Sequence, residues 1–241
     1  PHDLLPITRL PKPVKKILGG IAKAIPFHIK GKNYIIRGSK ELQERFIGNA
    51  FMFQESEREK LLKHPTKHYH HTEITKPLYD KVKHLDDVTK MQYIDINLWL
   101  IGDILLKADK MSCAHSLEVR VPFLDKEVFK VARTLPTKFK VNKENTKYAM
   151  RIASHRYLPD MVAEKKKLGF PVPIRVWLKE DKYYNIVKAA FTSKTAQTYF
   201  KTNEIVKFLD EHKAGKADNS RKIWTIYMFL VWHKQFFETA V

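Results

Sequence analysis

Residues 98–125 read LWLIGDILLKADKMSCAHSLEVRVPFLD, a stretch that interleaves apolar side chains with closely spaced charges. An ionised group costs several kcal/mol to bury unless it has a partner. The segment therefore predicts either a paired charge network or a ligand site. Its charged side chains are Asp103, Lys107, Asp109, Lys110, Glu118, Arg120 and Asp125.

The first part of this stretch belongs to a predicted amphipathic helix over residues 86–116. Apolar side chains recur there at steps of three and four residues and form one stripe. The stripe consists of Ile94, Leu98, Ile101, Leu105 and Ala108. Asp103, Lys107 and Lys110 fall on another face of the same helix.

The second part is predicted to be extended over residues 117–124, because Pro122 disfavours helix there. Asp125 follows and is well placed to cap a helix over residues 126–134. Most of the remaining chain is also predicted to be helical, and the only strands expected are Tyr34–Arg37 and Glu118–Val121. The other predicted helices cover residues 14–25, 41–63, 146–156, 177–191, 203–213 and 218–238.

The composition describes a strongly basic chain that can form a sizeable core. It has 241 residues, 44% of them hydrophobic, and a net charge of +19. One interpretation is a basic helical module that binds RNA or DNA. The other is a solvated lysine-rich surface. Lysines outnumber arginines and are spread along the chain, whereas proteins that read bases or clamp phosphates favour arginine forks. Nucleic acid is therefore not the expected partner.

Cysteine content and hydropathy limit the cellular setting. The single Cys113 excludes an internal disulfide and fits a reducing compartment. No apolar run reaches the roughly 18 residues of a membrane span. We therefore expect a cytoplasmic protein, and the missing initial Met suggests a piece of a longer one. The apolar stretch Ile223 to Trp232 is expected to leave uncovered surface, which would favour self-association into a homo-oligomer.

Two charge pairs in the opening stretch each allow two interpretations. Asp103 and Lys107 are four residues apart, so they could form a helix-surface ion pair or contribute to a site. Glu118 and Arg120 share one side of an extended segment. Arginine can fork onto a carboxylate there and fix a turn, or it can contact a substrate.

A lysine run near a glycine is another candidate site. Lys165, Lys166 and Lys167 precede Gly169, whose backbone can turn where other residues resist. A lysine on such a turn can direct a compact positive charge at phosphate oxygens, although a solvated basic loop fits the run as well. The histidines at 64, 68, 70 and 71 lack the spacing of a metal site and favour a solvated loop. We expect no metal site in this chain.

Several familiar motifs are absent. The chain has no GxxxxGK[ST] phosphate loop, no GxGxxG dinucleotide turn, and no HExxH, CxxC or GxSxG. The residues alone therefore give no complete catalytic set.

The pattern WLIGDILLKADKMSCAHSLEVRVPFLD, followed by TLP, K-x-x-x-R and KKKLGFPVPIRVWL, resembles the C-terminal part of glutamine-hydrolysing asparagine synthetases. The resemblance runs from about Asp95 to about Trp177. It implies a mostly α fold: the helical C-terminal portion of an α/β, adenine-nucleotide α-hydrolase-like synthetase domain, with few or no strands. It also implies a division into a basic helical lead-in (1–85), a signature region (86–180) and C-terminal helices (181–241).

The same resemblance implies an ATP-dependent amidotransferase, a ligase of asparagine biosynthesis. Such enzymes convert aspartate to β-aspartyl-AMP and pyrophosphate, and ammonia released from glutamine then displaces AMP. The family's SGGxDS loop, its acidic GxGxDE segment and its N-terminal glutaminase cysteine do not occur here. ATP and Mg²⁺ are therefore expected to be bound mainly by the remainder of the same enzyme, and the isolated chain is expected to be inactive. A relative with a different acceptor is an alternative.

The resemblance also assigns residues. It implies catalytic roles for Lys167, Asp103 and Asp109, and a place in the wall of the nucleotide pocket for Glu118, Arg120 and Lys107. Lys167 matches a lysine that contacts phosphate, although Lys165 replaces the family's leading arginine. The remaining matches are structural and comprise Pro122, Asp125, Gly169 and Phe170.

Overall fold

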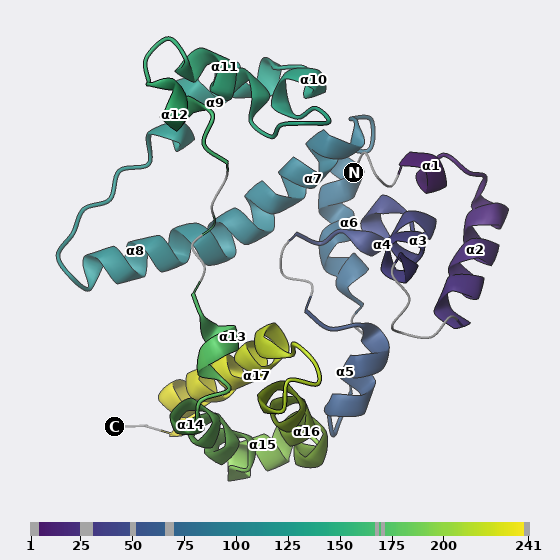
Figure 1. Cartoon of the computed structure of the whole chain (residues 1–241), viewed down its shortest axis with the longest axis vertical. Helices are drawn as coiled ribbons and strands as arrows, with labels where there is room; N and C mark the ends of the chain where they lie inside the picture. The colour runs from purple at the N-terminus through teal and green to yellow at the C-terminus, as the bar shows by residue number, and fades with distance from the viewer. Residues whose placement is uncertain are drawn as a thin grey trace. The chain divides into compact units, whose positions relative to one another are not determined.

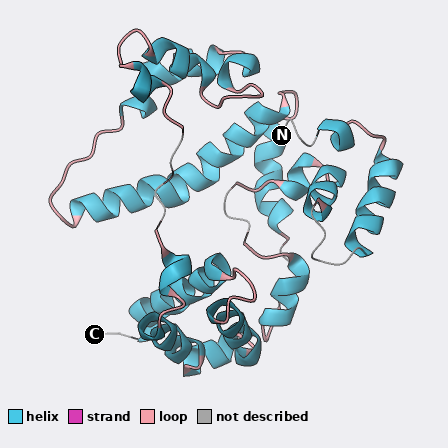
Figure 2. Cartoon of the chain, viewed as in Figure 1, coloured by secondary structure: helices cyan, strands magenta, loops and turns pink. Residues whose placement is uncertain are grey.

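The chain folds into two compact helical units in a computed structural model, and each unit is described by itself. The first comprises residues 1–50 and 70–167, and the second comprises residues 51–69 and 168–241. The described residues form helices and no strand (Figure 2). Only isolated bridges join Leu62 to Phe200 and Val141 to Thr146. This confirms the mostly α fold class. The structure describes residues 5–24, 31–48, 52–65, 70–166, 169 and 172–238.

The first unit begins with short helices that pack against one another (Figure 1). Helix α2 packs on α3, α1 also contacts α3, and α4 contacts α6. Close packing requires glycine at Gly38, where a Cβ atom would approach Ile7 Cβ to 2.8 Å. The bounds of these helices are α1 Leu5–Thr8, α2 Lys12–Ala24, α3 Lys32–Ser39, α4 Leu42–Arg45 and α6 His71–Lys81.

A continuous helical run from Asp87 to Cys113 follows, as predicted (Figure 1). It consists of α7 (Asp87–Ile94), the π-helical η2 (Asp95–Leu105) and α8 (Leu106–Cys113). Asp86 caps its start by accepting hydrogen bonds from the amides of Val88 and Thr89, at 3.0 and 3.2 Å. Within the predicted apolar stripe, Ile94 is fully buried, whereas Ile101 is 58% exposed.

The first unit ends with another group of short helices. These are η3 (Pro122–Leu124), α9 (Lys126–Thr134), α10 (Thr137–Lys140), α11 (Tyr148–Ser154) and α12 (Asp160–Ala163). Helix α9 contacts η3, α10 contacts α11, and α11 contacts α12. The predicted helices over 126–134 and 146–156 are therefore present, the second in shortened form.

Two predictions for the first half of the chain were wrong. Residues 34–37 lie in helix α3 rather than in a strand, because contacts with α1 and α2 override the β propensity of Ile35 and Ile36. The single helix expected over 41–63 is instead α4 and α5 (Glu55–Leu61). Gly48 has a φ of 80°, which ends any helical path between them.

The second unit has a well-packed apolar core. Phe191, Ala196, Ile205, Leu209 and Ile223 are all 0% exposed. The core lies among α5 and the C-terminal helices, and the predicted helices over 177–191, 203–213 and 218–238 are present with small shifts. These helices are α13 (Ile174–Trp177), α14 (Asp181–Phe191), α15 (Lys194–Tyr199), α16 (Thr202–Lys213), α17 (Ser220–His233) and η4 (Lys234–Glu238).

Backbone hydrogen bonds attach α5 to this unit across a long sequence separation. The amide of Lys63 donates to the Tyr199 carbonyl at 3.0 Å, and the amide of Lys201 donates to the Leu61 carbonyl at 2.8 Å. Lys222 and Glu57 add an ion pair. Such pairings cannot be read from local sequence patterns.

Candidate functional site

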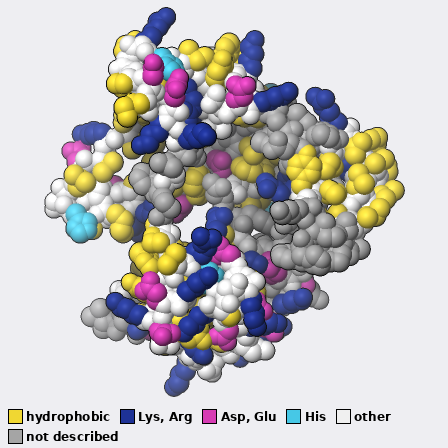
Figure 3. Space-filling model, viewed as in Figure 1, with side chains coloured by type: hydrophobic (Ala, Val, Ile, Leu, Met, Phe, Trp, Pro, Cys, Tyr) yellow, Lys and Arg dark blue, Asp and Glu magenta, His cyan; other side chains and the backbone are white. Residues whose placement is uncertain are grey.

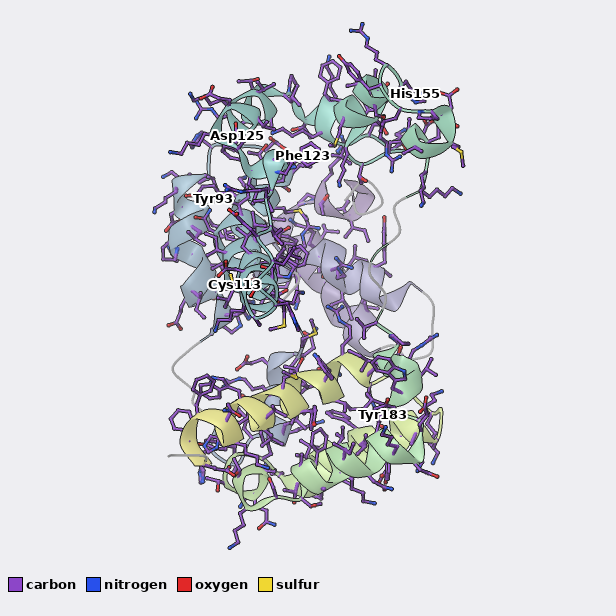
Figure 4. The ribbon with its side chains drawn as sticks, turned by 90° about the vertical axis from the view of Figure 1, so that its left-hand side faces the viewer. Tyr93, Cys113, Phe123, Asp125, His155 and Tyr183 are labelled. Atoms are coloured by element: carbon purple, nitrogen blue, oxygen red, sulfur yellow. The ribbon has the colours of Figure 1, made fainter. Side chains whose placement is uncertain are left out.

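The segment over residues 114–134, here called the exposed segment, contains no buried residue. Its large apolar side chains face solvent: Leu117 is 60% exposed, Phe123 67% and Val131 65%. Figure 4 labels Phe123 of η3 and Asp125, which precedes α9, away from Cys113 on α8. These side chains therefore add little to the core of their own unit.

Glu118 and Arg120 form an ion pair within the exposed segment. Arg120 Nη2 lies 2.5 Å from Glu118 Oε1, and the two side chains are 85% and 76% exposed. A pair this exposed contributes only about 0.2–1 kcal/mol to stability. It can orient the guanidinium, but it is a weak structural clamp.

Asp125 caps α9, as predicted. Its Oδ1 accepts hydrogen bonds from the amides of Glu127 at 2.8 Å and Val128 at 3.3 Å. The preceding Pro122 begins the single turn η3, and no described strand forms over residues 118–121, contrary to the short strand expected there. The motif thus fixes the geometry where the extended chain enters α9.

The helical candidates Asp103 and Asp109 lie on η2 and α8, and both are exposed. Asp103 Oδ2 accepts a hydrogen bond from Trp99 Nε1 at 3.0 Å. Among the described residues, no ion pair joins Asp103 to Lys107, so the first of the two interpretations of this pair, a helix-surface ion pair, is not seen. Asp109 Oδ1 lies 3.7 Å from Cys113 Sγ. No hydrogen bond in the described part of the chain links these carboxylates to the Glu118–Arg120 pair.

The lysine turn is only partly described. Lys167 and Phe170 lie outside the described residues, while Lys165, Lys166 and Gly169 are exposed. A Cβ atom at Gly169 would meet nothing within 4 Å, so crowding does not require glycine there. The roles assigned to Lys167, Gly169 and Phe170 stay predictions.

Arg151 holds the segment that leads into this turn. Its Nη1 donates to the carbonyls of Ala163 at 3.3 Å and Lys165 at 3.0 Å. Its Nε donates to the Thr146 carbonyl at 3.2 Å. One guanidinium therefore joins the chain just before α11 to the segment that enters the lysine run. In the sequence Arg151 stood out only as part of the K-x-x-x-R pattern. Its hydrogen bonds to backbone carbonyls could not be predicted, because side-chain spacing does not reveal them.

The described residues offer cations but no metal-binding cluster. They contain no group of three or more His, Cys, Asp or Glu side chains that could hold a metal ion. His68 lies outside the described residues, and His70 Nδ1 accepts a hydrogen bond from the Thr72 amide at 3.3 Å, which caps α6. Lys165, Lys166 and Arg120 carry cationic groups that suit phosphate oxygens.

The basic residues do not gather into one large patch on the face drawn in Figure 3. Lys and Arg side chains alternate there with acidic and apolar ones. In the described part of the chain, no helix is both long enough and apolar enough to span a bilayer.

Comparisons with known proteins identify relatives of the whole chain. The family model described as asparagine synthase matches residues 25–234. Asparagine synthetase (glutamine-hydrolysing) 1 of Bacillus subtilis strain 168 is 44% identical over 236 residues, which is 97% of this chain and 37% of that protein. A putative asparagine synthetase (glutamine-hydrolysing) of Mycobacterium tuberculosis H37Rv is 42% identical over 241 residues, again 37% of the relative.

A second Bacillus subtilis protein, asparagine synthetase (glutamine-hydrolysing) 3, is 31% identical over 103 residues. These cover 43% of this chain and 17% of that relative. No solved structure gives a significant match. The first two relatives match nearly the whole of this chain, and the chain spans 37% of the length of each of them.

Proposed function

The chain belongs to the asparagine synthase family, and from this premise we propose that it serves an ATP-dependent ligase that converts aspartate to asparagine. The supporting observation is the match over residues 25–234, which includes the exposed segment and the lysine turn. Because the relatives are longer than this chain, we propose that the remainder of the enzyme supplies the glutaminase and most of the ATP and Mg²⁺ contacts. The protein would act in the cytoplasm.

In this proposal the chain contributes one wall of the pocket for ATP and aspartate. Negative charge builds on the phosphate when β-aspartyl-AMP forms and pyrophosphate leaves. A cation fixed in advance stabilises that charge in the transition state. We assign this role to Lys167. Asp103 and Asp109 are assigned supporting catalytic roles, while Arg120, Glu118 and Lys107 line the wall.

Two features of the described residues support these assigned roles. The Asp125 cap fixes the start of α9, and the exposed Glu118–Arg120 pair orients the Arg120 guanidinium without burying the segment. Arg151 holds the chain before Lys167 through the carbonyls of Ala163 and Lys165. Charged groups on a segment held in this way lose little further freedom when a ligand binds.

Substitution of adjacent lysines tests the assignment. In the full-length enzyme, Lys167→Ala should lower asparagine formation and pyrophosphate release by about 10²–10³-fold, a typical loss for one electrostatic contact. Glutamine hydrolysis should not change. The matched control Lys166→Ala should retain nearly normal synthesis. Normal synthesis by Lys167→Ala, or equal losses in the two variants, would show that the assignment is wrong.

The 241-residue chain by itself should neither hydrolyse glutamine nor release pyrophosphate from ATP and aspartate. The measurement is a pyrophosphate assay on the purified chain, with the full-length enzyme as the positive control. Release of pyrophosphate by the isolated chain would overturn the proposed division between this chain and the remainder of the enzyme.

We also propose self-association through the outer face of α17. Trp224, Met228 and Trp232 recur every four residues and are 42%, 41% and 48% exposed. Ile223, Ile226 and Leu230 on the inner face are buried. Sedimentation velocity should show a homo-oligomer that dissociates in the Trp224→Gln/Trp232→Gln variant. A monomer at all concentrations would reject this proposal.

A further inference from the structure

A cavity of about 630 Å³ opens in the first unit, apart from every residue assigned to the synthetase reaction. Its size falls within the range of roughly 300–1,000 Å³ that is usual for small-molecule sites. Helices α2, α4, α6 and α7 contribute to its wall. The lining has seven basic residues, namely Lys12, Lys15, Lys40, Arg45, Lys76, Lys83 and Lys90.

The acidic residues of the lining are fewer and already engaged. Glu41 pairs with Lys15 at 3.0 Å, and Glu44 accepts a hydrogen bond from the amide of Glu41 at 3.0 Å. Asp87 lies 3.5 Å from Lys90 and 3.9 Å from Arg45. Because these three carboxylates serve neighbouring groups, the lining keeps an excess of positive charge.

Three of the lysines have no acidic partner within the described part of the chain. They are Lys12, Lys40 and Lys83, and they come from α2 and from the connections after α3 and α6. Lys12 and Lys83 are exposed and Lys40 is half-buried, so their ammonium groups are open to an anion that enters the cavity.

Arg45 adds a second, independent observation. Its side chain is 11% exposed, and neither Nε nor Nη1 has a hydrogen-bond partner. A buried donor without a partner costs about 1–3 kcal/mol. Tyr79 does not compensate the positive charge of Arg45 as a phenolate, because burial and then the Asp87 carboxylate raise the pKa of Tyr79 to about 12. Its hydroxyl donates instead to the Phe46 carbonyl at 2.8 Å.

We propose that this cavity binds a small phosphate-bearing anion with several negative charges. Lysine presents a compact charge that suits phosphate oxygens, and a multiply charged ligand would compensate several lysines at once. Gln43 of the lining adds a side-chain amide that can hydrogen-bond to a further oxygen. This inference is independent of the synthetase assignment, since none of these residues belongs to the proposed catalytic wall.

Calorimetric titration of the chain with inorganic tripolyphosphate tests the proposal. Lys40→Glu/Lys83→Glu should weaken binding at least about tenfold, because it reverses two charges that have no partner to lose. The matched control Lys126→Glu/Lys143→Glu changes net charge equally at exposed positions outside the cavity. It should bind within about twofold of the unmodified chain.

Three outcomes would overturn the proposal. The first is that the unmodified chain does not bind tripolyphosphate. The second is that both double variants weaken tripolyphosphate binding equally. The third is that a short single-stranded DNA binds more tightly than tripolyphosphate and loses affinity equally in both double variants. The last two would mean that the overall charge of +19, and not the cavity, attracts anions. Each variant should have the same thermal unfolding midpoint as the unmodified chain. An unchanged midpoint shows that altered binding does not reflect misfolding.

Discussion

The core of the second unit and the exposed segment of the first are both rich in large apolar side chains, but they differ in burial. Phe191 in the core is 0% exposed, whereas Phe123 in the exposed segment is 67% exposed. The exposed segment also lies within the stretch that resembles asparagine synthetases most specifically. The second unit therefore uses its apolar residues for its own stability, whereas those of the exposed segment are available for a site or for other parts of an enzyme.

The largest effect on stability is expected in the core. Phe191→Ala should lower the free energy of unfolding of the second unit by about 3–5 kcal/mol, because it leaves a cavity in a packed interior. Urea denaturation followed by circular dichroism measures the change. The matched variant Phe123→Ala should cost less than about 0.5 kcal/mol, as is usual for exposed positions. Similar losses in the two variants would remove the contrast between the regions.

The next largest effect on stability is expected at Arg151, because its guanidinium holds backbone segments that follow the exposed segment in the chain. Arg151→Met removes hydrogen bonds to three carbonyls, and one such bond from a charged group is worth about 1.5–3 kcal/mol. Amide hydrogen exchange should increase over residues 163–166 while the second unit keeps its protection. Unchanged exchange there would mean that Arg151 does not hold the chain before Lys167.

A smaller effect is expected at the cap of α9. Asp125→Ala removes acceptors for two amides and should cost about 1 kcal/mol, chiefly as faster exchange in the first turn of the helix. Asp125→Asn, which keeps an acceptor, should restore most of the protection. If both variants exchange like the unmodified chain, the cap does not stabilise this segment.

The smallest effect concerns the pH dependence of Asp95 at the start of η2. Burial raises the pKa of this carboxyl above 3.8, and its Oδ1 has no hydrogen-bond partner. The folded state therefore binds the proton more tightly than the unfolded state, so stability falls as pH rises through the folded-state pKa. Asp95→Asn should raise the thermal midpoint by about 1–2 °C at pH 7. The gain should shrink as pH falls toward 3.5, where the carboxyl is mostly protonated in both states, and an equal gain at both pH values would contradict the account.

Sequence patterns predicted the features that depend on neighbouring residues. The helix over 86–116 and the Asp125 cap follow from periodicity and side-chain chemistry within a few positions, and both are present. The strand expected at 34–37 failed because packing of α3 against α1 and α2 decides its conformation. The long helix expected over 41–63 is interrupted at Gly48, whose φ is 80°, and α5 then pairs with residues near 200, far away in the sequence.

The candidate site divides in the same way. The Glu118–Arg120 pair was anticipated because alternation in extended chain brings the two side chains to one side. The carbonyl contacts of Arg151 and the cavity of lysines could not be anticipated, since both depend on how separate helices meet. Lys12, Lys40 and Lys83 become neighbours of one cavity only in the folded unit.

The most direct test of the central claim is to measure stability and synthesis together in Arg120→Met of the full-length enzyme. Arg120 is 85% exposed and pairs only with Glu118 among the described residues. We predict a thermal midpoint within about 1 °C of the unmodified enzyme and pyrophosphate release reduced at least about tenfold. Normal pyrophosphate release, or a loss that simply parallels a lower midpoint, would contradict the view that the exposed segment serves the reaction and not the fold.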